Sequence, residues 1–424
     1  MGDFPRYERY KESGVEWLGE IPEHWNILKN KFLFKEKKET VGSNSNKFIL
    51  LSLTLNGVIA RDMDNPQGKF PAEFNTYKIV EPNNLIFCLF DIEETPRTVG
   101  HSEQRGMITG AYDIFECNSK IYSRYIYYYY LYLDFNKRLQ PLYTGLRKVI
   151  KRDSFLSIKS PVPPFEEQKK IADFLDRKTL EIENAIAKKQ RLIELLEEQK
   201  TILINQAVTK GLNPDVPMKD SGIDWIGEIP EHWEIKRAKY IFKQIDERSE
   251  TGQEELLSVS HITGVTPRSE KNVSMFMAED YTGSKICKKD DLVMNIMWAW
   301  MGALGISPQT GIVSSSYGVF RHKTTNQLNS WYIENLLRST EYIAEYNRRS
   351  TGLRSSRLRL YPDVFLDMVI SLPSKNEQDR IEKIIKKQTK MIDNVVKTIE
   401  TEIEKLNELK QILISQAVTG KIKI

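Results

Sequence analysis

Residues 166–208 read EEQKKIADFLDRKTLEIENAIAKKQRLIELLEEQKTILINQAV, and residues 377–418 read EQDRIEKIIKKQTKMIDNVVKTIETEIEKLNELKQILISQAV. Neither run contains proline or glycine, and as a helix each would span about 60 Å at about 1.5 Å per residue. In both runs one set of positions recurs in alternating steps of four and three, which is the coiled-coil period. These seam positions are Leu175, Thr179, Ile182, Ile186, Lys189, Ile193, Leu196, Lys200, Leu203 and Ala207 in the first run, and Ile385, Thr389, Ile392, Val396, Ile399, Ile403, Leu406, Lys410, Leu413 and Ala417 in the second. A helix of that length cannot bury its apolar face alone, so the two runs are predicted to pair with each other.

The composition is that of a globular chain. Its 424 residues are 40% hydrophobic, and the length suits two to four domains. The formal net charge of +4 permits nucleic-acid binding without demanding it. Cys88, Cys117 and Cys287 lack the CxxC spacing of a zinc site, and their scatter favours a reducing compartment. No apolar run approaches the roughly 20 residues of a membrane span, and no signal peptide is visible, so we expect a cytoplasmic protein with no membrane partner.

The chain also repeats itself outside the two long runs. Residues 10–34 and 218–242, which we call the opening segments, share the heptapeptide GEIPEHW. The period is about 208 residues, which is far too long for a solenoid and therefore indicates a duplicated domain-plus-helix unit. The repeated tryptophans are predicted to seat each opening segment against a core. For His24 and His232 we expect a satisfied buried or capping role rather than a metal-binding one, because no second ligand is nearby.

More divergent stretches follow each opening segment. Three pairs of strand candidates occur in the same order, at residues 49–58 and 256–265, 84–90 and 291–297, and 106–115 and 311–320. Between these anchors the halves share little, since residues 91–105 and 298–310 are unrelated in chemistry. The scaffold is therefore predicted to be repeated while its loops are not.

Residues 122–135, YSRYIYYYYLYLDF, are rich in tyrosine. Aromatic side chains interleaved with arginine can stack on nucleic-acid bases. The alternative is a packed helix whose tyrosine hydroxyls reach its surface.

A basic turn follows in each half, TGLRK at residues 144–148 and TGLRS at residues 351–355. Glycine lets the backbone approach another molecule closely, and flanking cations suit phosphate groups; a solvated basic loop is the alternative. The candidate DNA-contacting residues are Gly145, Arg147, Lys148, Lys151 and Arg152 in the first half, and Arg348, Arg349, Gly352, Arg354 and Arg357 in the second.

The order of these motifs resembles that of the DNA specificity (S) subunit of type I restriction–modification enzymes. It runs from an opening segment with G-x-I-P-x-x-W through a variable domain, a T-G-L-R turn and a proline-containing lead to a long helix that begins with Glu-Gln, and then repeats. The resemblance covers essentially the whole chain, and the order and duplication make it specific. It implies an α+β fold with target-recognition domains at residues 1–163 and 211–373, joined by long antiparallel coiled-coil helices at residues 164–210 and 374–424, with pseudo-two-fold symmetry.

The same resemblance implies the partners. Each domain would read one half of a split sequence in double-stranded DNA, and the helices would set the spacer between the halves. The helices would also dock modification (methyltransferase) subunits, two in number, which carry S-adenosylmethionine. A restriction subunit, an ATP-dependent translocase and nuclease, would complete the complex. The S subunit itself is implied to hold no cofactor.

Symmetry supports this interpretation independently of the family. Two similar domains on antiparallel helices produce a pseudo-two-fold axis, and duplex DNA has local two-fold symmetry. Such a molecule can contact half-sites about one helical turn apart, roughly 34 Å. The repeated cations would then bind phosphates, while the divergent loops read base edges.

Two other functions remain open from the residues alone. An enzyme is disfavoured because the sequence contains neither G-x-x-x-x-G-K-[ST] nor G-x-G-x-x-G. The run Glu167-Gln168-Lys169 matches a nuclease E-x-K, but no upstream Asp is placed beside it. No catalytic or metal-binding residue is therefore assigned. A coiled-coil scaffold that binds only proteins is the third possibility, and salt-sensitive binding to a bipartite duplex would exclude it.

Overall fold

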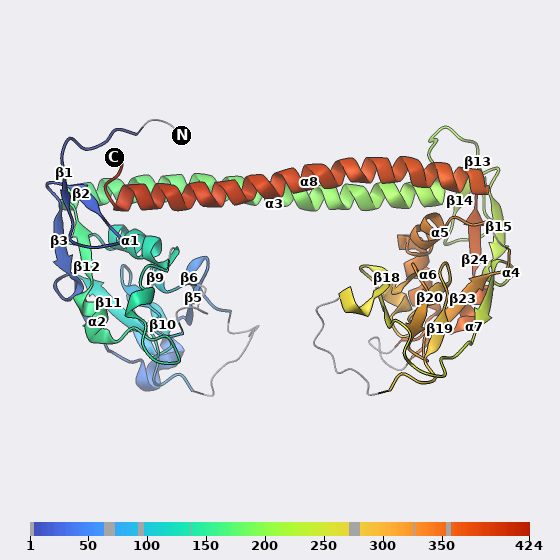
Figure 1. Ribbon diagram of the computed structural model, residues 1–424, viewed down its shortest axis with the longest axis horizontal. Helices are drawn as coiled ribbons and strands as arrows, with labels where there is room; N and C mark the ends of the chain where they lie inside the picture. The colour runs from blue at the N-terminus through green and yellow to red at the C-terminus, as the bar shows by residue number, and fades with distance from the viewer. Residues whose placement is uncertain are drawn as a thin grey trace. The chain divides into compact units, whose positions relative to one another are not determined.

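Both heptad-patterned runs are helical in the computed structural model, as α3 (Phe165–Lys210) and α8 (Lys375–Val418). The structure describes residues 4–62, 73–91, 97–135, 137–270, 280–324, 327–352 and 358–424. They form two units, unit 1 from Met1–Gln190 with Glu400–Ile424, and unit 2 from Arg191–Ile399. Each unit thus contains one mixed α/β domain and one half of each long helix (Figure 1). None of the helices among these residues has the length and apolarity needed to cross a membrane.

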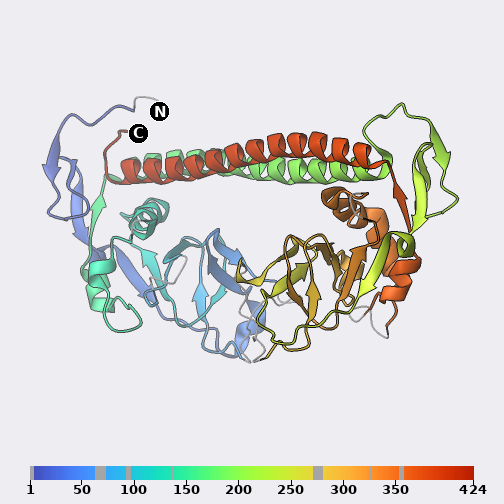
Figure 2. The same cartoon turned by 45° about the vertical axis from the view of Figure 1, so that its right-hand side comes forward.

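The two long helices pair antiparallel within each unit, and Figures 1 and 2 show them side by side. In unit 1, Lys189 Nζ lies 2.5 Å from Glu402 Oε2, and Lys410 Nζ lies 3.4 Å from Glu183 Oε1. In unit 2, Lys200 Nζ lies 2.5 Å from Asp393 Oδ1. Every predicted seam position is buried or half-buried. The prediction that the two runs pair along this seam is therefore confirmed within each unit.

The domain of unit 1 is built around a four-stranded antiparallel sheet in the order β4-β11-β8-β9. Its strands are β4 (Phe34–Lys37), β11 (Asp113–Cys117), β8 (Leu85–Phe87) and β9 (Val99–His101). Two-stranded pairs surround it: β1 (Tyr10–Glu12) with β2 (Glu20–Pro22), β3 (Asn26–Lys29) with β12 (Lys159–Val162), β5 (Leu51–Thr54) with β6 (Gly57–Ala60), and β7 (Lys78–Val80) with β10 (Gly106–Ile108). The helices are α1 (Ser123–Phe135) and α2 (Arg152–Ser157), with short 3₁₀ turns η1 (Asn30–Phe32), η2 (Gly42–Lys47) and η3 (Gln140–Leu142).

The domain of unit 2 repeats this topology, with the sheet order β16-β23-β20-β21. Its strands are β16 (Phe242–Ile245), β23 (Gly318–His322), β20 (Leu292–Met294) and β21 (Leu304–Ile306), with the pairs β13 (Met218–Asp220) and β14 (Glu228–Pro230), β15 (Glu234–Arg237) and β24 (Val369–Leu372), β17 (Leu257–Ser260) and β18 (Gly264–Pro267), and β19 (Lys285–Cys287) and β22 (Gly311–Val313). Its helices are α4 (Ala238–Ile241), α5 (Ser330–Leu337), α6 (Thr340–Arg349) and α7 (Pro362–Asp367), with 3₁₀ turns η4 (Arg268–Glu270) and η5 (Ala299–Met301). The duplication seen in the sequence is thus a duplication of strand order.

One pair of strand predictions was wrong in detail. Residues 106–115 and 311–320, each predicted as a single strand, form two strands that belong to different sheets. In the first half a turn separates them, in which Tyr112 N donates to Thr109 O at 3.2 Å. Neither run contains proline or an Asn-Gly or Asp-Gly pair, so no strong turn signal showed where the chain leaves one sheet for the other.

The tyrosine-rich stretch forms the packed helix α1. Ten of its thirteen residues are buried. Its hydroxyls are bonded to neighbouring protein groups: Tyr128 to Asp176 Oδ1 at 2.6 Å, and Tyr132 to Trp17 O at 3.0 Å. These rings are therefore part of the core of unit 1, which confirms the packed-helix alternative over base stacking.

A repeated pair of side chains, which we call the Glu-Gln anchor, joins each domain to its long helix. Glu167, in the first turn of α3, accepts a hydrogen bond from Trp25 Nε1 at 3.0 Å, and its second carboxylate oxygen lies 2.8 Å from His24 Nε2. Glu377 of α8 makes the same two contacts, with Trp233 at 3.2 Å and with His232 at 2.8 Å. The indoles of Trp25 and Trp233 are buried, as expected. Both histidines are satisfied by a carboxylate partner, but they are about half exposed rather than buried.

The glutamines complete the anchor by binding the backbone on both sides. Gln168 Oε1 accepts from Tyr122 N at 2.8 Å, and its Nε2 donates to Pro163 O at 2.9 Å. Gln378 accepts from Asn329 N at 2.9 Å and donates to Pro373 O at 3.0 Å. One Glu-Gln pair therefore fixes three segments to one helix start. They are the opening segment, the proline just before the long helix (Pro163 or Pro373), and the residue just before α1 or α5 (Tyr122 or Asn329).

The last six residues, 419–424, leave α8 and run along the first opening segment in unit 1. Lys423 N donates to Pro5 O at 2.7 Å, and Lys421 Nζ donates to Glu20 O at 2.7 Å. Ile422 is buried in the same core as Trp25. In unit 2, where α3 continues directly into the next opening segment, Lys210 donates in the same way to Glu228 O.

We predict that Glu167→Ala lowers the free energy of unfolding by about 1–3 kcal/mol, because it leaves the buried Trp25 indole N–H without an acceptor. Urea denaturation followed by tryptophan fluorescence measures the change. The matched control is Glu166→Ala, since Glu166 is 78% exposed and bonds only to Lys169 one turn away among the contacts that the structure describes. Equal stability of the two variants would contradict the anchoring role.

Candidate nucleic-acid interface

The first basic turn is a closed loop on the surface of unit 1. Thr144 and Val149 exchange both backbone hydrogen bonds, at 2.9 and 3.0 Å. Gly145 has a φ of 73° and Lys148 a φ of 47°, so the chain reverses through left-handed conformations that favour glycine at the first position. Leu146 and Lys148 are exposed at its tip. The loop therefore presents its backbone and its cation to solvent.

Arg147 has a carboxylate partner that the sequence did not reveal. Its guanidinium donates to both carboxylate oxygens of Asp91, from Nε at 3.1 Å and from Nη2 at 2.5 Å. The Asp91 backbone N–H in turn donates to Arg147 O at 2.8 Å. The Arg147 hydrogen bond holds the pKa of the Asp91 carboxyl below its ordinary value. Arg147 is thus oriented by a counter-ion that comes from the end of a different strand.

The other candidates in unit 1 follow the loop directly. Lys151 is exposed at the N-cap of α2. Arg152, the first residue of α2, forms an ion pair with Glu36 of β4. The five candidates of the first half, Gly145, Arg147, Lys148, Lys151 and Arg152, therefore lie on one short stretch of surface.

The second half closes its loop in the same way. Thr351 and Arg359 exchange both backbone hydrogen bonds, at 3.0 and 2.9 Å, around a segment that begins with Gly352. Arg354 and Arg357 lie outside the residues that the structure describes. Each loop then returns beside the end of a sheet strand, since Ile150 N donates to Leu89 O and Leu360 N donates to Ile296 O. The repeated turns therefore occupy corresponding places in the two domains.

Arg348 and Arg349 end α6 just before this second loop, and they share one acid. Arg348 donates to Glu345 from Nε at 2.6 Å and from Nη2 at 2.7 Å, and Arg349 Nε donates at 2.5 Å. Glu345 is 2% exposed, and the Arg348 hydrogen bond lowers its pKa. The two arginines and the glutamate together carry a net charge of +1. Arg348 is the more exposed of the two arginines.

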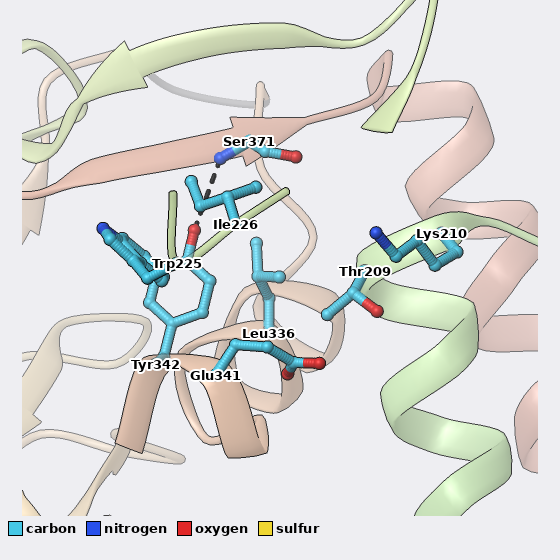
Figure 3. Close-up of a pocket in the computed structure, with 8 residues that line it drawn as sticks. All are labelled: Thr209, Lys210, Trp225, Ile226, Leu336, Glu341, Tyr342 and Ser371. Carbon is cyan, nitrogen blue, oxygen red and sulfur yellow. Dashed lines mark hydrogen bonds between the residues drawn. The ribbon is translucent and has the colours of Figure 1, made fainter. Parts of the chain in front are cut away.

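Hollows also lie elsewhere in the described residues, one in unit 2 and others in unit 1. The hollow in unit 2 has a volume of about 20 Å³ and is lined by Trp225 and Tyr342, which pack edge-on. Figure 3 shows these residues and the Tyr342 hydroxyl, which accepts from Ser371 N at 3.4 Å. That volume is about the size of one water, so it is a packing gap at the domain–helix junction. In unit 1, a cleft of about 880 Å³ lies between the β5–β6 turn, α1 and the two long helices.

Known proteins share both sequence and fold with this chain. The family described as Type I restriction modification DNA specificity domain matches residues 109–195. The type I restriction enzyme MjaVIII specificity subunit of Methanocaldococcus jannaschii is 27% identical over 317 residues, 69% of this chain and 70% of the relative. The putative type I restriction enzyme MjaX specificity subunit of the same organism is 26% identical over 316 residues, 70% of this chain and 68% of the relative. The family model, these relatives and the fold together support a specificity subunit of a type I restriction–modification enzyme.

Two solved structures share the fold of this chain. A chain from a study of complex assembly and conformational transition of the type I R-M system has a TM-score of 0.65 at 11% identity, covering 94% of this chain and 98% of that one. The HsdS subunit from Thermoanaerobacter tengcongensis has a TM-score of 0.52 at 13% identity, covering 95% and 98%. The α+β fold predicted from the sequence is confirmed by these likenesses.

The relatives are specificity subunits, and this likeness supports a noncatalytic DNA-recognition subunit rather than an enzyme. The nuclease-like run at Glu167-Gln168-Lys169 has a structural explanation that fits this. The Glu167 carboxylate is engaged by Trp25 and His24 in the Glu-Gln anchor. The phosphate-contacting role of the ten candidate residues stays a prediction.

We predict that the Asp91 carboxyl titrates below the ordinary pKa of aspartate and that Arg147→Ala raises its pKa toward that value. Because the folded-state pKa is lowered, the Arg147–Asp91 contact is intact above the ordinary pKa and is lost as the pH falls through the lowered one. Carbon-13 NMR of labelled aspartate carboxyls measures the titration. Arg9→Ala, which removes an exposed arginine paired with Glu23 instead, is expected to leave Asp91 unchanged.

Proposed function

We propose that this specificity subunit reads a bipartite sequence in double-stranded DNA, with one half-site for each domain. The observation that carries the proposal is the repetition of one sheet order and one closed basic turn in two domains whose intervening loops differ. A repeated scaffold suits what the two half-sites share, which is the phosphate backbone. Divergent loops suit what the half-sites do not share, which is their bases.

The candidate residues would bind phosphates through charge and close backbone approach. They are Gly145, Arg147, Lys148, Lys151, Arg152, Arg348, Arg349, Gly352, Arg354 and Arg357. Arg147 is already held in a bidentate geometry by Asp91, and a phosphate offers the same pair of acceptor oxygens. Exchange of the carboxylate for a phosphate would therefore keep the guanidinium orientation.

We assign DNA reading to the globular domains, and spacing and subunit docking to the long helices. Residues 1–163 and 211–373 would be the target-recognition domains, and residues 164–210 and 374–424 the spacer and docking helices. The ion pairs of seam lysines with acids on the opposite helix support this role, because they favour one antiparallel register. A single register of this pairing within each unit is what a spacer of defined length would need.

The long helices would also dock the modification subunits, two in number to match two similar halves, and a restriction subunit would join these. An exposed apolar row supports protein docking. Leu192, Leu195, Ile202, Met391 and Val395 are exposed in unit 2, and each directly precedes a seam residue. In an antiparallel pair, residues at the same offset from the seam lie on the same side. Exposed apolar rows of this kind mark contact sites. The cleft of unit 1 offers a second surface for a partner.

We predict that Arg147→Ala weakens binding to duplexes of every sequence and reduces the slope of log K against log salt concentration by about 0.9, the value for one phosphate contact. Fluorescence anisotropy of labelled duplexes at several salt concentrations measures both. Asp91→Ala keeps the cation and is expected to retain the full slope. Arg9→Ala is the control for loss of an exposed arginine. Binding by Arg147→Ala that matches wild type at every salt concentration would refute the phosphate role.

We also predict that one added heptad in both helices changes the spacer and not the half-sites. Insertion after Lys188 in α3 and after Glu404 in α8 keeps the observed pairing and lengthens the pair by about 10 Å, about three base pairs. Mapping of methylated adenines in cells that contain the partner subunits measures the new target. A heptad in α3 alone is the control, because it breaks the register and should abolish modification. New half-site bases would contradict the assignment of the helices as spacers.

A further inference from the structure

Trp298, which follows β20 in unit 2, is a large aromatic side chain left on the surface. It is 47% exposed. Its ring stacks on that of Trp300, with centroids 6.2 Å apart and planes at 14°. Among the described residues, none accepts a hydrogen bond from its indole N–H, whereas the Trp300 Nε1–H donates to Met297 O at 3.0 Å. Trp300 is thus bonded to the backbone of its own domain, whereas the Trp298 indole is exposed and can contact another molecule.

The backbone holds Trp298 in one position. Its N–H donates to Asn295 O at 3.0 Å, and its carbonyl accepts from Met301 N at 2.9 Å and from Ala303 N at 3.2 Å. The Asn295 side chain is buried and donates to the Tyr317 hydroxyl at 3.0 Å. A ring that is fixed before binding loses little conformational entropy when it meets a ligand.

The segments around Trp298 carry the cations of the second half. The 3₁₀ turn η5, which begins at the next residue, packs against α6, and α6 ends in Arg348 and Arg349. Ile296, two residues before Trp298, pairs with Leu360 at the return of the basic loop. The indole therefore follows a segment that is hydrogen-bonded to the return of the basic loop, and proteins that bind nucleic acids combine aromatic rings with positive charge to bind bases together with their phosphates.

The first half carries a different residue at this place. Residues 84–90 match residues 291–297, so Trp298 corresponds to Asp91, which holds Arg147. The same point beside the basic loop is thus a carboxylate that orients a cation in one domain and an uncharged aromatic ring in the other. A ring cannot pair with phosphate, whereas its face suits a base. A difference between the two domains at this point is what the reading of different half-sites requires.

We propose that Trp298 contacts the DNA target of the second domain by stacking its indole on a base at a locally unstacked step. This rests on the proposed DNA-reading function and adds a specificity-determining residue to it. Apolar and aromatic side chains inserted at base steps unstack them, and the cost depends on the sequence of the step. Trp298 would therefore affect selectivity at one half-site and leave the other unchanged.

The experiment uses the full chain with its methyltransferase subunits and a duplex containing the target mapped from methylated adenines. Trp298→Ala is expected to weaken binding at least about fivefold, the lower range for loss of one stacked base, with no change in the salt slope, because no phosphate contact is removed. Trp298→Phe is expected to recover most of the affinity, and Trp298→Leu, which keeps apolar bulk without an aromatic face, is not. Tyr240→Ala is the matched control, since Tyr240 is 65% exposed in the same domain.

Duplexes in which one half-site is replaced by unrelated sequence show where the contact is made. The loss caused by Trp298→Ala should disappear when one particular half is replaced and persist when the other is. Equal affinities of Trp298→Ala and Tyr240→Ala, or an Ala variant that keeps its DNA affinity but no longer retains the methyltransferase subunits on size exclusion, would overturn the inference. If the Trp298→Ala variant does not fold, the DNA affinities of Trp298→Phe and Trp298→Leu are compared instead, and equal affinities would overturn the inference. A wild-type complex that does not prefer the mapped duplex over random sequence would instead refute the proposed function itself.

Discussion

The carboxylate in the first turn of each long helix is the contact on which the rest of the structure depends. Glu167 and Glu377 each bind a buried indole and a histidine of an opening segment. A carboxylate at a helix N-terminus is also favoured by the helix dipole. The adjacent glutamine then ties down the backbone on either side of the junction. A recognition surface has a defined orientation on its helix only because this junction is rigid.

The seam between the helices serves specificity as well as stability. Three lysines at seam positions give up apolar burial and instead reach acids on the opposite helix. A seam made only of isoleucine and leucine would tolerate shifted or parallel pairings, whereas each lysine matches an acid in one antiparallel register alone. These ion pairs define the register, since a shift by one heptad would displace each lysine from its acid by about 10 Å.

The sequence predicted best what is local and periodic. The seam positions were predicted because a heptad pattern in an uninterrupted run has one helical solution, and the basic turns were predicted because glycine marks a chain reversal. The partners of Glu167 and Arg147 were not predicted, because Trp25 and Asp91 lie 142 and 56 residues away along the chain. The break between two strands at residues 109–112 was missed because the run carries no proline and no Asn-Gly or Asp-Gly pair to mark a turn. Trp298 was seen only as part of an unmatched loop, because its exposure depends on the packing of Trp300 beneath it.

Residues 419–424 make with the first opening segment the same junction that α3 makes with the second. In unit 2 the backbone therefore connects the helix end to the opening segment, whereas in unit 1 noncovalent contacts hold the two together. A helix end therefore packs against an opening segment in the same way in each unit, whether or not the backbone runs through the junction. A circular permutant, opened within residues 211–217 and bridged between residues 424 and 4, would have the two domains in exchanged order along the chain and the same contacts in space. Either half could thus come first during synthesis without altering what the folded subunit presents.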